Sequence, residues 1–168
     1  MSRRLASSLV TRRKRRHTVE HPQLAARRTP WTLTYSWYGG MGPGKVTFVL
    51  NSDGRATLTS KRHLEPHPSV SDYDIEPEQI ARIGRVVDRT DLLCQTVQPR
   101  EGYVIRDLGR FSISVTSGDF SKTVFIDGEH TIPDPRALSK VREALISMTP
   151  KLPESIAWGP YGTVTVPA

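Results

Sequence analysis

The sequence predicts an α+β domain, a two-layer sandwich in which an antiparallel sheet of four to five strands carries two helices on one face. Two observations lead to this prediction. Several segments alternate apolar and polar residues around short turns, and two further segments repeat apolar residues at helical spacing. A hairpin with one apolar side must have that side covered, and two amphipathic helices can cover it. The predicted order is β-β-β-α-β-β-α, in a single domain at residues 30–150.

The clearest hairpin runs from Phe111 to Ile126 around a two-residue Gly-Asp turn at residues 118–119. Glycine in the first central position favours a type II′ turn, whose twist matches that of the flanking strands. This turn places Phe111 opposite Ile126 and Ile113 opposite Val124 on one apolar side. The other side carries mostly serine and threonine, so we expect it to face water.

The first predicted strand covers residues 31–38, and a glycine-rich loop separates it from a second strand at residues 46–50. A phosphate-binding role is excluded because a strand, not a helix, follows the loop. Two interpretations remain, a flexible hairpin connection or a mobile loop that binds a protein partner. The second interpretation depends on aromatic and methionine side chains beside the glycines. Its candidate binding residues are Trp37, Tyr38, Gly39, Gly40, Met41 and Gly42.

A turn at residues 52–54 leads to a third strand at residues 55–60. Its length follows from the hydrophobic pattern. A two-residue loop would set apolar residues against polar ones, whereas a three-residue loop sets Leu50 opposite Ala56 and keeps the apolar residues together. We therefore predict the three-residue loop, with Gly54 in the left-handed conformation.

Residues 61–75 contain two prolines and are predicted to form a loop. A helix then begins at Pro77, a residue favoured in the first turn, and its apolar stripe passes through Ile83 and Val87. Glycine is unfavourable inside a helix, so Gly84 is expected to mark a close approach of this helix to the sheet.

Between the two predicted helices, the sequence contains no arrangement of residues that indicates a catalytic site. Cys94 has no nearby histidine signature and is predicted to be a small buried hydrophobe. The segment 103–105 is expected either to add a short strand or to pin a loop to the core. Asp127, Glu129 and His130 share one flexible loop, and such a loop fixes no acid–base or metal arrangement. We therefore expect no catalytic residues, no metal site and no cofactor.

The second helix is predicted at residues 135–148, with Asp134 as its cap and Pro135 in its first position. Residues 151–168 form a C-terminal extension. They are expected either to add an edge strand or to remain a loose tail.

The positive charge is concentrated at the N-terminus. The net charge of the chain is +7, yet residues 1–30 hold nine Lys or Arg against one acid, and the other 138 residues hold fifteen against sixteen. Residues 1–29 are therefore predicted to be a basic, disordered tail. The alternative is an electrostatic arm for nucleic acid or another anionic surface, or a targeting signal. Its residues would be Arg12, Arg13, Lys14, Arg15 and Arg16.

The order of elements and five local motifs carry a resemblance to a known group of domains. The five motifs are Asn51–Gly54, Glu76–Ile80, Val87–Leu93, Phe111–Ile126 and Pro135–Met148. With these motifs the chain resembles small bacterial domains that include emfourin-like inhibitors of thermolysin-type metallopeptidases and uncharacterised lipoprotein-like domains. The similar segments lie within residues 31–149, and the chain lacks the lipoprotein signal and its cysteine. The resemblance implies a non-enzymatic binding domain and identifies no inhibitory residue.

The sequence therefore predicts a small, non-enzymatic binding domain with an unknown protein partner, in the manner of a peptidase inhibitor. The alternative is a nucleic-acid-associated protein that binds through residues 1–28. The single cysteine excludes an internal disulfide, and no secretory signal is recognised, so we expect a cytoplasmic location.

Overall fold

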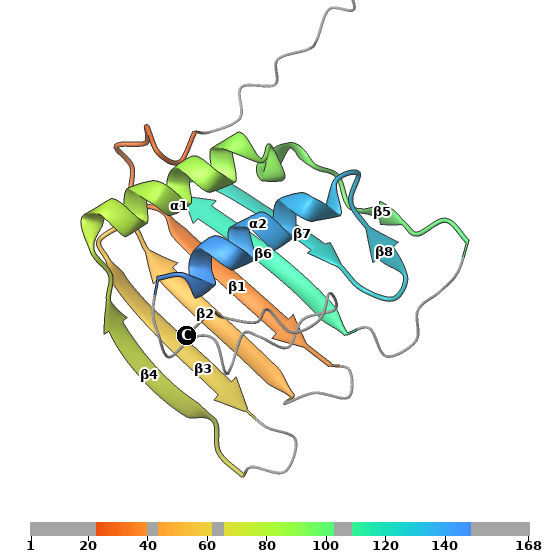
Figure 1. Ribbon diagram of the computed structural model, residues 1–168, viewed down its shortest axis with the longest axis horizontal. Coiled ribbons are helices and arrows are strands. Elements are labelled where there is room, and N and C mark those ends of the chain that lie inside the picture. The colour runs from red at the N-terminus through yellow and green to blue at the C-terminus, as the bar shows by residue number, and fades with distance from the viewer. Residues whose placement is uncertain (1–22, 40–43, 62–65, 103–108, 149–168) are drawn as a thin grey trace, which may run out of the picture.

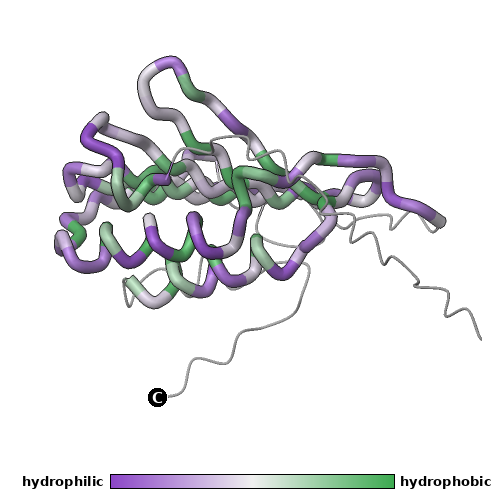
Figure 2. Tube along the Cα trace, turned by 90° about the horizontal axis from the view of Figure 1, so that it is seen from above, coloured by the Kyte–Doolittle hydropathy of each residue, from purple (hydrophilic) through white to green (hydrophobic). Residues whose placement is uncertain are grey.

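The computed structural model describes residues 23–39, 44–61, 66–102 and 109–148 of the 168-residue chain. These residues form two layers, a six-stranded antiparallel sheet and a pair of helices that lie together on one of its faces (Figures 1 and 2). The predicted α+β class is confirmed. The sheet has six strands where four to five were expected.

The main sheet has the strand order β4-β3-β2-β1-β6-β7, so β1 lies between the two hairpins that flank it (Figure 1). A second sheet is formed by the short strands β5 and β8. The strands are β1 (Thr32–Tyr38), β2 (Lys45–Asn51), β3 (Arg55–Lys61), β4 (Ser69–Asp74), β5 (Gln98–Pro99), β6 (Arg110–Ser117), β7 (Phe120–Ile126) and β8 (His130–Thr131). The helices are α1 (Pro77–Arg89), the short 3-10 helix η1 (Leu92–Cys94) and α2 (Pro135–Ile146).

The predicted registers of both hairpins are confirmed. Phe111 pairs with Ile126 across β6 and β7, and Leu50 pairs with Ala56 across β2 and β3. Gly118 and Gly54 have φ angles of 57° and 96°, as their turns require. The turn lengths and the alternating pattern were therefore sufficient to fix both pairings.

One face of the sheet, here called the covered face, packs against both helices and forms the core. Alternate residues of five strands point into it, and all but those near the ends of β3 and β7 are buried. Leu33 and Tyr35 of β1 are fully buried at its centre, and Ile83 of α1 and Leu138 of α2 are fully buried as well. The strand residues of this face are Leu33, Tyr35, Trp37, Val46, Phe48, Leu50, Ala56, Leu58, Phe111, Ile113, Val115, Val124 and Ile126.

The prediction that residues 61–75 form a loop was wrong for β4, which pairs with β3 as an edge strand. Val70 of this strand is 58% exposed, and Asp72 and Asp74 are exposed too. Edge strands commonly carry charged residues, which discourage further strand pairing. An exposed strand of this kind has no apolar face, so its sequence did not show the alternation that revealed the other strands.

Both helices begin as the sequence indicates. Pro77 and Pro135 occupy their first turns, and the Asp134 carboxylate accepts a hydrogen bond of 3.1 Å from the Arg136 N–H. The regular part of α2 ends at Ile146, two residues before the predicted end, and Met148 is nevertheless buried.

Residues 23–29 pack against the domain, although the sequence placed them in the disordered tail. Leu24 is only 1% exposed, and the N–H groups of Leu24 and Ala25 donate to the two carboxylate oxygens of Asp88 on α1 at 2.8 and 3.0 Å. A Cβ atom on Gly84 would lie 3.2 Å from the Cα atom of Ala25. Gly84 therefore marks a close approach of α1 to this segment, not to the sheet as predicted.

The remaining predictions about the tails fall on residues that the structure does not describe. These are residues 1–22 with the arginine-rich cluster, residues 103–105, and residues 151–168. In the described ranges, no helix has the length and apolar character needed to cross a membrane.

Candidate functional site

The second face of the sheet, here called the open face, is not covered by either helix (Figure 2). Its residues alternate with those of the covered face, and half of them are serine or threonine. Some pair across strands, as where the Ser114 and Thr123 hydroxyls lie 2.9 Å apart. The hydroxyl residues of this face are Thr32, Thr34, Ser36, Thr47, Thr57, Thr59, Ser112, Ser114, Thr116, Ser121 and Thr123.

One end of the open face carries charged and aromatic side chains in a line across four neighbouring strands. Lys61 of β3 pairs with Lys45 of β2, Lys45 pairs with Tyr38 of β1, and Tyr38 pairs with Arg110 of β6. All four side chains are exposed, and Tyr38 is 64% exposed. We call these four residues the cation–tyrosine row.

Two lysines of the row stand directly opposite each other. In the described part of the chain, neither Lys45 nor Lys61 forms an ion pair with an acidic side chain. Like charges directly opposite on neighbouring strands destabilise a sheet by a few tenths of a kcal/mol up to about 1 kcal/mol. An anion bound between the two ammonium groups would relieve this repulsion.

The far end of the row is neutralised and held in place. The Arg110 guanidinium lies 3.1 Å from the Asp127 carboxylate and 4.5 Å from the centre of the Phe125 ring. The other carboxylate oxygen of Asp127 accepts from the N–H groups of Glu129 and His130 at 2.9 and 2.7 Å and lies 3.0 Å from His130 Nδ1. Arg110 therefore has a fixed position at the edge of the row.

These contacts shift the ionisation of Asp127. Burial is the largest single influence and acts to raise its pKa, but the hydrogen bonds from Glu129, His130 and Arg110 together outweigh burial and hold the pKa below its ordinary value. The carboxylate is thus engaged in closing a turn. Glu129 takes part only through its backbone, and the described residues contain no group of three acidic, histidine or cysteine side chains placed to hold a metal ion.

The structure separates the predicted binding residues Trp37 and Tyr38. Trp37 is only 5% exposed and faces the helices, so its prediction as a surface residue was wrong. The reason is that strand alternation puts Trp37 beside Tyr35 on the covered face, whereas Tyr38 lies on the open face. Gly39 closes the strand end with a 3.1 Å hydrogen bond from its N–H to the Gly44 carbonyl. The other candidates, Gly40, Met41 and Gly42, lie outside the described residues.

Tyr38 is held on a tightly packed backbone. Gly109, which precedes β6, has a φ of 71°, and a Cβ atom there would lie 2.7 Å from the Tyr38 carbonyl oxygen and 3.0 Å from the Gly39 carbonyl carbon. Only glycine fits such a position without displacing its neighbours. The exposed phenol ring therefore projects from a backbone that has little room to move.

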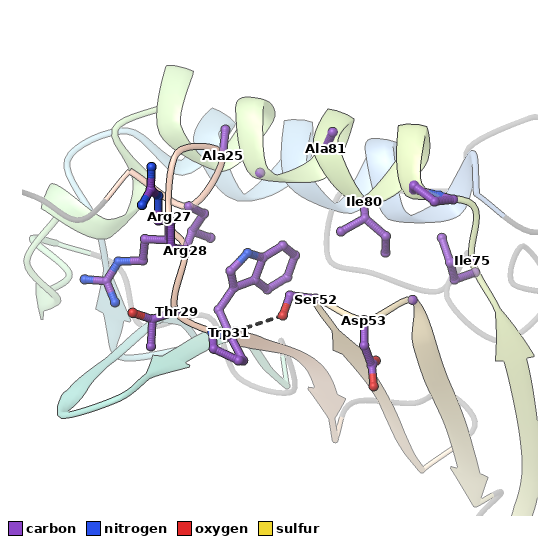
Figure 3. A pocket seen from close by; sticks show the side chains of 15 residues that line it. Ala25, Arg27, Arg28, Thr29, Trp31, Ser52, Asp53, Ile75, Ile80 and Ala81 are labelled. Carbon is purple, nitrogen blue, oxygen red and sulfur yellow. Dashed lines mark hydrogen bonds between the residues drawn. The ribbon is translucent and has the colours of Figure 1, made fainter.

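A separate pocket of about 360 Å³ lies at the other end of the fold, between residues 24–31, the turn at residues 52–54 and the first half of α1 (Figure 3). The Trp31 side chain stands in this pocket beneath α1, and its backbone N–H donates to the Ser52 hydroxyl at 3.0 Å. Ile80 of α1 points toward the same space (Figure 3). The pocket and the Lys45–Lys61 pair lie at opposite ends of β2 and β3.

Two polar groups are buried in the core below the row. The Tyr35 hydroxyl and Trp37 Nε1 have no hydrogen-bond partner in the described residues. Burial raises the pKa of Tyr35 far above its ordinary value, and the smaller opposing effect of the Arg142 charge lowers it. Tyr35 therefore stays protonated and serves as a packing residue, and its ring forms a T-shaped pair with the Phe111 ring at 5.1 Å between centroids.

Cys94 is exposed, so the prediction of a buried cysteine was wrong. Leu92 and Leu93, its neighbours in η1, occupy the buried positions and leave the thiol at the surface. Partial burial is the largest influence on the Cys94 thiol and raises its pKa; the Asp91 charge raises it further, while Lys122 lowers it. A raised pKa keeps the thiol protonated and weakens it as a nucleophile.

No protein-family model matches this chain, and no curated protein matches it.

Proposed function

We propose that this chain is a non-catalytic binding domain that takes a protein partner on the open face of its sheet, at the cation–tyrosine row. The observation that carries the proposal is the exposure of Tyr38, which is 64% exposed at the end of a central strand. Val70 at the sheet edge is the other large apolar residue with high exposure among the described residues.

Tyr38 has the properties of an interface anchor. Tyrosine is enriched at the centres of protein interfaces, because its ring contributes a large contact area and its hydroxyl a hydrogen bond. A side chain on a rigid strand loses less conformational entropy on binding than one on a mobile loop. The backbone contacts of Gly39 and Gly109 supply that rigidity here.

The residues around Tyr38 fit the rim of such an interface. Ser36 and Thr47 form the next row of the open face, and their hydroxyls can donate or accept hydrogen bonds. An aromatic anchor with a polar surround is the usual composition of a protein-binding surface. An inhibitor-like form of this function, in which the Tyr38–Gly39 corner enters a peptidase cleft, belongs to the same proposal.

The test compares Tyr38→Ala with the matched control Val70→Ala in the full chain. Each protein is immobilised, exposed to a lysate of the source organism, and the retained protein is identified and then titrated in purified form. We expect Tyr38→Ala to weaken binding at least 30-fold, the scale of an interface hot spot, and Val70→Ala to change it less than twofold. Equal affinity of the two variants would contradict the proposal.

A second candidate function is nucleic-acid binding through residues 12–16, supported by five consecutive basic residues. Binding of this kind depends on counterion release and falls steeply with salt concentration. The candidate predicts that changing residues 12–16 to glutamine abolishes the binding of a 20-nucleotide DNA duplex at 50 mM salt. Unchanged binding would eliminate it.

A further inference from the structure

We propose that the cation–tyrosine row recognises an acidic polypeptide segment, one with at least two neighbouring carboxylates that are bound by Lys45 and Lys61. This inference deepens the proposed function and rests on it, because it names the chemistry of the partner that contacts the row.

The charge pattern of the row supports an anionic partner. Arg110 is neutralised by Asp127, whereas Lys45 and Lys61 face each other with no ion pair in the described residues. Their repulsion costs stability in the free domain. A bound pair of carboxylates removes this cost. An anion therefore stabilises these two lysines more than it would stabilise two isolated surface lysines.

The spacing of the row fits an extended chain. Neighbouring strands lie about 4.8 Å apart, and alternate side chains of an extended peptide lie about 7 Å apart on one side. The flexible lysine stems can span that difference. Tyr38 stands next to Lys45 on the adjacent strand, where it can pack on the stem or an apolar side chain of the same segment.

The surroundings of the row favour a polypeptide over a nucleic acid. Residues 31–168 hold fifteen basic and sixteen acidic side chains, and the open face itself carries Asp72 and is bordered by Asp127. A nucleic-acid surface needs an extended basic track and several exposed aromatic rings for stacking. Tyr38 is the one highly exposed aromatic side chain of the open face in the residues described.

The test uses the full-length chain with residues 12–16 changed to glutamine, so that the N-terminal cluster does not bind the probe. The probe is a fluorescein-labelled peptide of eight glutamates, followed by fluorescence anisotropy at 50 mM salt. The variant pair Lys45→Gln/Lys61→Gln is compared with Arg82→Gln/Arg85→Gln, which removes the same charge from the exposed side of α1.

We expect the lysine pair to weaken binding about three- to tenfold, as two partly exposed ion pairs would, and the arginine pair to change it less than twofold. Equal losses would show that net charge alone attracts the peptide and would overturn the inference. Absence of peptide binding would also overturn the inference. The same holds if an eight-nucleotide thymidine strand binds more tightly than the peptide and depends equally on the two lysines.

Different experimental results would disprove the inference and the proposed function. If the retained partner is lost with Tyr38→Ala but binds the lysine variants normally, the binding surface stands and its preference for acidic segments is wrong. If neither Tyr38 nor the lysines affect the partner, both are wrong.

Discussion

The two faces of the sheet are built from the same strands but carry different types of residue. On the covered face, every cross-strand neighbour is apolar or aromatic over the central strands, as where Tyr35 pairs with Phe48 on one side and with Ile113 on the other. On the open face, half of the residues are serine or threonine, and one end of the face carries the cation–tyrosine row. The packing of the covered face determines stability, whereas neither helix packs on the open face.

This difference indicates where function is to be sought. A covered residue is constrained by volume, so its identity reports on packing. An exposed pair such as Lys45 and Lys61 is not required by packing and even opposes folding. Residues that cost stability without a structural benefit are often found at functional sites.

The largest effect is expected on the covered face. Phe48→Ala removes a fully buried ring from the centre of β2 and should lower the free energy of unfolding by about 3–5 kcal/mol. Val49→Ala, the next residue on the open face, should cost less than about 1 kcal/mol because Val49 is only half-buried. Urea unfolding of the two variants measures the difference, and equal losses would mean that the two faces are not distinct.

The contact between residues 24–25 and α1 should have an intermediate effect. Asp88→Ala leaves the N–H groups of Leu24 and Ala25 without their acceptor and should cost about 1–2 kcal/mol of unfolding free energy. Amide hydrogen exchange at these two residues should accelerate in the variant. Unchanged exchange would show that the segment does not depend on Asp88.

The Asp127 carboxylate, which holds Arg110 in place, is expected to make the free energy of unfolding depend on pH. Because the folded-state pKa of Asp127 is lowered, this carboxylate stabilises the fold above the ordinary aspartate pKa of about 4 and loses that contribution as the pH falls through its lower folded-state pKa. Asp127→Asn should therefore cost about 1 kcal/mol at pH 7, and the difference from the parent protein should close in acid.

The exposed Asp119 supplies the control, since Asp119→Asn removes the same charge without these hydrogen bonds. Urea unfolding at several pH values gives the comparison. A cost for Asp127→Asn that stays constant from pH 7 into strong acid would contradict the assigned hydrogen bonds.

The smallest predicted effect has the opposite sign. Lys45→Thr removes the repulsion with Lys61 and should raise the free energy of unfolding by a few tenths of a kcal/mol. The gain should shrink at high salt, which screens exposed charges, and vanish when Lys61 is already threonine. A loss of stability in both backgrounds would show that Lys45 packs favourably and does not carry a cost.

The local sequence pattern was enough to predict the hairpins and the helices, but it could not predict the cation–tyrosine row. Turn length and alternation determined the pairs Phe111–Ile126 and Leu50–Ala56, because each hairpin joins neighbouring segments. The row, by contrast, joins Lys61, Lys45, Tyr38 and Arg110 from four strands. It depends on the pairing of β1 with β6, two strands that lie far apart in the sequence.

The other differences have local physical reasons. Trp37 was expected at the surface because it lies beside a glycine-rich loop, but the alternation of the strand places it on the covered face. The short segment around Leu24 carries too few apolar residues to reveal that it packs on α1. Cys94 follows two leucines that take the buried sites, which composition alone does not indicate.

The central claim is that the open face binds an acidic segment at the cation–tyrosine row. It is tested most directly by mapping backbone amide chemical shifts of the chain with residues 12–16 changed to glutamine as the octaglutamate peptide is added. The claim predicts shifts that concentrate at Tyr38, Lys45 and Lys61 and at neighbouring positions of β1–β3. Shifts that spread over the exposed arginines of α1, or that leave these positions unchanged, would contradict it.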